Sequence, residues 1–317
     1  MRKTCGAFLL MGALAACTPV EQPYVAQASQ PPRLESEVFV ADDGALLPYR
    51  SWLPAGKPRA VLLALHGFND YSRAFEGTGA YLAAHGIAVY AYDQRGFGAG
   101  RLPGIWGGRK NLAEDVAEWI EVLRLKYHDR RLYLLGESMG GAVAIHAATQ
   151  PGFPRVDGLV LVSPAMWGGD TMNPFYRILT NVSAYMFPGH TVTGDDLDIL
   201  ATDNMEILRE MGRDPLIIKA TRLDAIYGLV DLMDEAYKDA SGVEIPTLLM
   251  YGGNDQVILP EVIEKSAEHI PAPLHCIYYP NAYHMLLRDL AGRNAQKDLK
   301  NWLISAPAAP RLKPCKN

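Results

Sequence analysis

The chain has 317 residues, enough for one large domain with an insertion. Hydrophobic residues make up 49% and charged residues 21%, an ordinary globular composition that excludes collagen-like, low-complexity and wholly disordered chains. The formal net charge of −5 argues against nucleic acid as a partner, because phosphate binding needs clustered positive charge. The four cysteines, Cys5, Cys17, Cys276 and Cys315, are too far apart in sequence to form a zinc cage or a disulfide framework.

Residues 1–16 have the pattern of a secretory signal peptide. Two basic residues, Arg2 and Lys3, precede an apolar stretch that has roughly half the length of a membrane-spanning helix. The stretch ends in Leu14-Ala15-Ala16-Cys17, which resembles the bacterial lipobox, where the leader is removed before a cysteine that carries a lipid. The alternative is a plain secretory leader followed by an incidental cysteine.

A lipid on Cys17 would hold the protein at a membrane, because each buried CH₂ contributes about 0.8 kcal/mol. We therefore expect a lipid-anchored protein of the bacterial cell envelope. Thr18 stands where an aspartate often retains such proteins in the inner membrane, so the periplasmic face of the outer membrane is favoured. Residues 17–36 are rich in Pro, Gln, Ala and Ser, which predicts a flexible tether.

Short β segments alternating with helices dominate the rest of the chain. Residues 37–41 and 46–52 flank the turn Asp42-Asp43-Gly44 and predict a hairpin. Continuous apolar runs, typical of strands buried on both faces, follow at 60–65, 87–92, 132–135, 159–162, 247–251 and 274–279. Helical stretches lie between them at 74–84, 112–127, 142–149, 261–269 and 291–303. This order predicts an α/β fold, a mostly parallel central sheet with helices on both faces, formed by residues 37–164 and 245–304, with a tail at 305–317.

Residues 165–244 interrupt this alternation, because they contain no core strand. Helical patterns are predicted there over 174–186, 195–211 and 215–238. Ligands of such sheets bind beyond the carboxyl ends of the strands, where this segment begins and ends, so we expect a helical lid. Its apolar residues either pack within the lid or contact an acyl chain or a lipid surface; they are Trp167, Phe175, Tyr176, Tyr185, Met186 and Phe187.

A candidate nucleophile lies in Gly136-Glu137-Ser138-Met139-Gly140, which matches the G-x-S-x-G motif. A strand ends just before the motif and a helix rich in small residues starts just after it, the context that the motif requires. We expect that only glycine fits at positions 136 and 140, because neighbouring backbone passes too close there for a Cβ. The pattern predicts that Ser138 sits in a strained turn with its hydroxyl above the sheet.

A serine hydroxyl becomes a good nucleophile only when a base takes its proton, and the base is usually a histidine oriented by a carboxylate. His284 follows the last core strand in a loop before the final helix, where loops converge on Ser138. The other histidines considered for the role fall inside a strand, within helices or in surface turns: His275, His269, His146, His85 and His128. We therefore predict His284 as the base.

The orienting acid is expected after an earlier core strand and downstream of the serine. Asp255, in Gly252-Gly253-Asn254-Asp255, meets both conditions, and the order Ser138, Asp255, His284 is that of α/β-hydrolases. Asp93, at the end of the strand 87–92, is the rival acid. It precedes the serine, so we interpret its loop as bracing.

A second loop is predicted to stabilise negative charge on the substrate oxygen. His66-Gly67-Phe68 follows the strand 60–65, and the backbone N–H groups of Phe68 and Met139 are the candidate oxyanion donors. His66 is interpreted mainly as a residue that fixes this loop, with a role as a second base as the alternative.

Together these motifs resemble the monoglyceride lipase and lysophospholipase-like branch of the α/β-hydrolases, over about residues 37–303. The resemblance rests on His66-Gly67, Asp93-Gln94-Arg95-Gly96-Phe97-Gly98, Gly136 to Gly141, Asp255 and Ala282-Tyr283-His284 with Leu286-Leu287. The sequence departs from that branch at Glu137, where histidine is frequent, and at Phe68-Asn69-Asp70, where a smaller, glycine-containing segment is common. A bulky Phe68 could narrow the pocket, which counts against a preference for long-chain monoglycerides.

The resemblance implies a serine ester hydrolase that works through an acyl-serine intermediate, without a cofactor or a metal. Lipid-like esters such as monoacylglycerols or lysophospholipids are the expected substrates. A thioesterase, an amidase or a short-chain carboxylesterase with the same triad is an alternative, and so is a catalytically silent lipid-binding envelope lipoprotein. A bond between Cys276 and Cys315 is possible in an oxidising compartment.

Overall fold

A computed structural model describes residues 18–23, 30–171, 174–194, 198–305 and 315. The predicted signal peptide at 1–16 and the predicted lipidation site Cys17 lie outside these residues. Within the described part of the chain, no helix combines the length and the apolar character needed to cross a bilayer.

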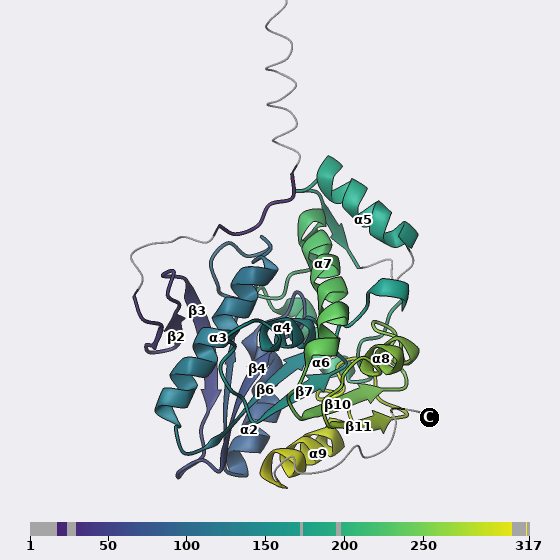
Figure 1. Ribbon diagram of the computed structural model, residues 1–317. Coiled ribbons are helices and arrows are strands. Elements are labelled where there is room, and N and C mark those ends of the chain that lie inside the picture. The colour runs from purple at the N-terminus through teal and green to yellow at the C-terminus, as the bar shows by residue number, and fades with distance from the viewer. Residues whose placement is uncertain (1–17, 24–29, 172–173, 195–197, 306–314, 316–317) are drawn as a thin grey trace, which may run out of the picture.

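A nine-stranded sheet forms the centre of the molecule (Figure 1). Its strand order is β1-β2-β3-β5-β4-β6-β7-β10-β11. The strands from β5 to β11 run parallel, and β3 joins β5 in antiparallel register. The bounds of these strands are β1 Arg33–Leu34, β2 Val38–Val40, β3 Leu46–Trp52, β4 Ala60–Leu65, β5 Ile87–Tyr92, β6 Arg131–Glu137, β7 Gly158–Val162, β10 Thr247–Gly252 and β11 Leu274–Tyr279. The predicted mostly parallel sheet is confirmed.

Helices cover both faces of the sheet, because the central strands carry apolar side chains in both directions. Alternate residues of one strand separate into two cores: Leu63 of β4 packs with Trp119, whereas Leu62 packs with Leu299. The first face is covered by α3 (Arg109–Lys126), α4 (Met139–Ala148) and α8 (Pro260–Ala267), and the second by α2 (Glu76–Ala84) and α9 (Gly292–Ser305) (Figure 1). Short 3₁₀ turns lie at η1 Ser72–Phe75, η2 Gly169–Thr171 and η3 Ala240–Gly242.

Of the elements in the inserted segment 165–244, α5 lies at one end of the molecule and contacts α7, which runs down to α4 (Figure 1). Its elements are α5 (Pro174–Met186), β8 (Thr191–Thr193), α6 (Met205–Arg213), β9 (Ala220–Arg222) and α7 (Leu223–Asp239). The first predicted helix agrees with α5, but the starts predicted for the next two are wrong. The side chain of Asn204 accepts a hydrogen bond from Ile207 N–H and caps α6 there. The residues before α7 are extended, since β9 pairs with β8.

The predicted tether contains segments that are packed against the fold. Gln22 donates its backbone N–H to Trp106 O at 2.8 Å and its side-chain amide to Ile105 O at 3.0 Å. Val20 N–H donates to the carboxylate of Asp224 at the start of α7. Further along, β1 pairs with β2. Residues 18–23 therefore form a strap, which holds the N-terminal end of the described chain beside the ends of α5 and α7 (Figure 1).

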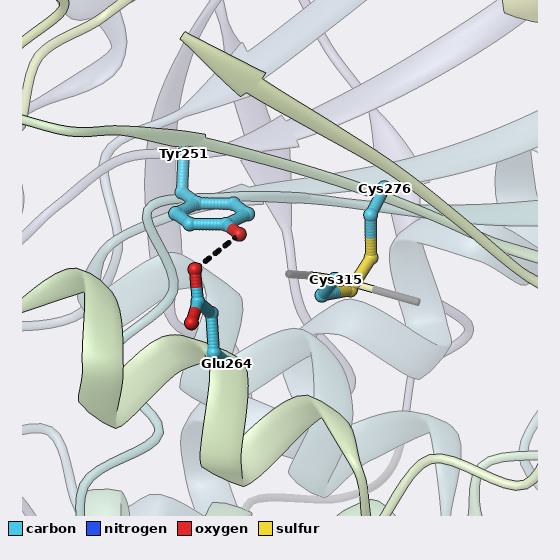
Figure 2. Close-up of a disulfide and its surroundings, with 4 residues drawn as sticks. All are labelled: Tyr251, Glu264, Cys276 and Cys315. Atoms are coloured by element: carbon cyan, nitrogen blue, oxygen red, sulfur yellow. Dashed lines mark hydrogen bonds between the residues drawn. A yellow bond between two sulfur atoms is a disulfide. The ribbon is translucent and has the colours of Figure 1, made fainter. Parts of the chain in front are cut away.

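A disulfide joins Cys276 in β11 to Cys315 in the C-terminal tail, with their Cα atoms 5.5 Å apart. Figure 2 shows it close to the hydroxyl of Tyr251, which donates a 2.9 Å hydrogen bond to Glu264 of α8. The bond that the sequence left open is thus present in the structure, and it ties the tail to the edge strand of the sheet.

Candidate active site

The turn that carries Ser138 is strained as the motif predicts. Ser138 has a φ of 54°, in the left-handed region, and lies between the end of β6 and the first residue of α4. A Cβ on Gly136 would overlap the backbone of Gly140, and a Cβ on Gly140 would overlap the carbonyl of Leu65. Strand, turn and helix are thus packed backbone against backbone, which lifts the serine above the sheet, where it stays half-buried.

The loops after β10 and β11 bring His284 and Asp255 together. Nδ1 of His284 lies 2.8 Å from Oδ2 of Asp255, and both side chains are buried. The other oxygen of Asp255 accepts the backbone N–H groups of Val257 and Ile258 at 2.8 and 2.9 Å. An ionised carboxylate only accepts, so Nδ1 carries the proton and Nε2 of His284 is left as the basic nitrogen.

Both carboxylate oxygens of Asp93, the rival acid, already accept hydrogen bonds from the backbone. Its two oxygens accept the backbone N–H groups of Ser72 and Ala99 at 3.0 and 2.8 Å. Two residues further on, Arg95 is buried between Asp43 and Asp115, with its closest nitrogens 2.6 Å from an oxygen of each. These contacts fit the interpretation of this loop as bracing.

The loop after β4 faces the serine with free backbone donors. A Cβ on Gly67 would lie 3.3 Å from the Cβ of Ser138, so the two loops are in contact. Among the hydrogen bonds of the described residues, none uses the backbone N–H of Phe68 or of Met139. These are the two amides predicted to hold the oxyanion.

His66 is buried and bonded through both ring nitrogens. Nε2 accepts the N–H of Gln94 at 3.0 Å, so Nδ1 donates to Gly67 O at 2.8 Å. Burial lowers the pKa of His66 below its ordinary value and keeps the ring neutral. This arrangement supports the role of fixing the loop and leaves no free nitrogen for a second base.

An ion cluster beside the candidate triad was not predicted from the sequence. Arg288, four residues after His284, lies 2.7 Å from Asp70 and 3.2 Å from Glu137 through its two terminal nitrogens. Glu137 directly precedes Ser138, and Asp70 lies two residues after Phe68. The available signal was that both acids stand where the sequence departs from the family branch that it resembles.

The inserted segment contacts the histidine loop directly. Met285 N–H donates to Ala201 O at 2.8 Å, and the hydroxyl of Thr202 donates to Asp289 at 2.6 Å. A cavity of about 420 Å³ opens between α6 and this loop, and Asp70 and Arg288 contribute to its wall. Its described lining residues include neither Ser138 nor His284. Within the described chain, no group of three or more His, Cys, Asp or Glu side chains is arranged to hold a metal ion.

The parallel sheet, the strained serine turn and the histidine–aspartate pair after the last two strands define an α/β-hydrolase. The chain belongs to the family described as serine aminopeptidase, S33, whose model matches residues 56–291.

Known relatives agree with this class. The chain is 25% identical to the monoacylglycerol lipase of Mycolicibacterium smegmatis over 280 residues, which cover 84% of this chain and 96% of that protein. It is 26% identical to human monoglyceride lipase, covering 80% and 84% of the two chains. A crystal structure of monoglyceride lipase from Saccharomyces cerevisiae has a TM-score of 0.72 at 23% identity, over 89% of this chain and 98% of that one. The predicted α/β-hydrolase fold, the resemblance to monoglyceride lipases and the class of serine ester hydrolase are confirmed.

Proposed function

We propose that this protein hydrolyses lipid-like carboxylic esters, of the monoacylglycerol or lysophospholipid type, through an acyl-serine intermediate. The observation that carries the proposal is the 2.8 Å contact between Nδ1 of His284 and Asp255, which directs the basic Nε2 away from the acid. Ser138, on its strained turn, is the group that this base would activate.

The reaction would proceed in two balanced halves. His284 takes the hydroxyl proton of Ser138 while Oγ attacks the ester carbonyl, and the N–H groups of Phe68 and Met139 bind the oxygen that becomes negative. The C–O bond to the alcohol breaks, and His284 gives its proton to the leaving oxygen. Water then attacks the acyl-serine and loses a proton to the same imidazole. The bond between the acyl carbon and Oγ breaks, and His284 returns its proton to Oγ, which releases the carboxylic acid and restores the serine. Asp255 holds the imidazole and stabilises its protonated form.

The lipid-like nature of the substrate is supported by the relatives, which are named as lipases of monoacylglycerols, and by the surface of α5. Apolar side chains recur along this helix at spacings of three and four residues and are exposed to solvent; they are Phe175, Ile178, Leu179, Val182, Tyr185 and Met186. A helix with such a face fits the surface of a bilayer or micelle, from which an ester could enter.

We also propose that Cys17 carries a lipid that anchors the protein in the bacterial envelope. The strap supports this, because Val20 N–H bonds Asp224 at the start of α7, so the segment that follows the cysteine runs beside the helices of the insertion. A membrane anchor on this segment would bring the exposed face of α5 close to the bilayer. Cells fed a labelled fatty acid should incorporate the label into the parent protein but not into Cys17→Ala. A parent protein without label would contradict the anchor.

The catalytic assignment is tested by Ser138→Ala, assayed with p-nitrophenyl esters and with panels of monoacylglycerols, lysophospholipids and short-chain esters. Turnover should vanish, and a fluorophosphonate probe should label the parent protein but not the variant. Turnover retained in the variant would refute the assignment. A folded parent protein that neither reacts with the probe nor hydrolyses any ester would favour a lipid-binding protein.

A further inference from the structure

Arg288 joins three loops that are far apart in the sequence. It lies on the histidine loop, and its guanidinium reaches Asp70 on the oxyanion loop and Glu137 on the serine turn. The two bonds use different terminal nitrogens, so the flat guanidinium spans the gap between the carboxylates as a lysine could not. A single side chain thereby fixes the distance between the candidate base, nucleophile and oxyanion donors.

The cluster is not neutral. It contains two carboxylates and one guanidinium and is largely removed from water: Glu137 is only 2% exposed. Burial raises the pKa of Glu137 above its ordinary value, while the charges of Arg288 and His284 act to lower it. Burial alone would lower the pKa of Arg288, but the two carboxylates outweigh it and raise that pKa.

The position of the Glu137 side chain depends on Arg288. Oε2 of Glu137 accepts the bond from Arg288, and Oε1 is buried without a hydrogen-bond partner among the described residues. On the other side of the guanidinium, one oxygen of Asp70 accepts from Arg288 at 2.7 Å and the other accepts the backbone N–H of Tyr71 at 2.8 Å.

We propose that Arg288 is a positioning residue that clamps the oxyanion loop and the serine turn to the histidine loop, with Asp70 and Glu137 as the two side chains that it holds. This inference rests on the proposed function, since it assumes that His284 accepts the serine proton. Both acids act through Arg288, so changes at any of the three residues should affect the same step.

Two variants test the clamp. Arg288→Lys keeps the positive charge but cannot bond both carboxylates at once, so we expect kcat to fall by about tenfold or more while KM changes less. Glu137→Gln keeps the size of the side chain and an acceptor oxygen for Arg288, so it should lower kcat by less than Arg288→Lys does.

Matched controls come from a second ion pair remote from the site. Arg124 in α3 lies 2.6 Å from Asp157, so Arg124→Lys and Asp157→Asn make the same chemical changes elsewhere. Neither should move kcat. If Glu137→Gln does not fold, Asp70→Asn makes the same change at the other carboxylate held by Arg288 and should also lower kcat by less than Arg288→Lys does.

The outcomes separate this inference from the proposed function. Full activity in Arg288→Lys, with Ser138→Ala inactive, would overturn the clamp and leave the hydrolase intact. A loss of kcat in Arg124→Lys as large as in Arg288→Lys would overturn the clamp as well. If the parent protein hydrolyses no ester in the panel, the rate of fluorophosphonate labelling replaces turnover as the readout. Absence of labelling would overturn both proposals together.

Discussion

Replacing Asp255 by Asn is expected to remove activity by reversing the proton on His284. In the native structure Oδ1 of Asp255 accepts two backbone N–H groups and Oδ2 faces Nδ1 of His284. The asparagine amide has one oxygen and one NH₂, and its oxygen must stay where two donors already point. The NH₂ group then faces Nδ1, which must become the acceptor. The proton moves to Nε2, and the imidazole can no longer take the proton of Ser138.

The size of the effect follows from these contacts. Turning the amide over would leave two backbone donors facing NH₂, at a cost of about 1 kcal/mol for each lost hydrogen bond. A difference of about 2 kcal/mol leaves only a few per cent of the molecules with the correct tautomer, since 1.36 kcal/mol is a factor of ten. The charge that stabilises the imidazolium is lost as well. Together we expect kcat to fall by about 10⁴, the loss known for the same change in a serine protease triad.

The assay is steady-state hydrolysis of a p-nitrophenyl ester, with thermal unfolding followed by circular dichroism. Asp93→Asn is the matched control, because Asp93 is also buried and also accepts two backbone N–H groups, from Ser72 and Ala99. It should lower stability by about 1–3 kcal/mol and change kcat by less than tenfold. The reasoning is refuted if Asp255→Asn keeps kcat within tenfold of the parent, or if a folded Asp93→Asn loses as much.

Four further variants test the fold. Gly140→Ala should prevent folding or lower the free energy of unfolding by more than about 3 kcal/mol, because its Cβ would overlap strand backbone. The control Gly77→Ala in α2 meets nothing within 4 Å and should raise the free energy of unfolding by about 0.5–1 kcal/mol. Equal melting temperatures of the two variants would contradict this. Changing Cys276→Ser removes the disulfide to Cys315, which closes a loop of 39 residues, and should lower the free energy of unfolding by at most about 4 kcal/mol. Unfolding in urea measures this loss, with the reduced parent protein as control. A larger loss would show that the packing of Cys276 contributes as well. Arg95→Met leaves two buried aspartates unpaired and should cost about 3–5 kcal/mol at neutral pH, a prediction that fails if the melting temperature is unchanged.

The sequence determined those parts of the protein whose signals are local. The central strands were predicted because they are continuous apolar runs between helices, and the turn at Ser138 because glycines at fixed spacing flank it. The pairing of His284 with Asp255 was predicted because both follow core strands, whose carboxyl ends meet at one edge of a parallel sheet. Each of these inferences needs only a short segment and a general rule of sheet geometry.

Only the tertiary structure decided which distant side chains meet. Residues 70, 137 and 288 carry no shared pattern, and they are brought together because β4 and β6 are neighbours and the loop after β11 folds over their ends. The strap is similar, since a polar segment rich in Pro and Gln gives no sign that Gln22 bonds a loop more than eighty residues away. In both cases the interacting residues are brought together by the fold of distant segments. A pattern of residues along the chain does not contain that information.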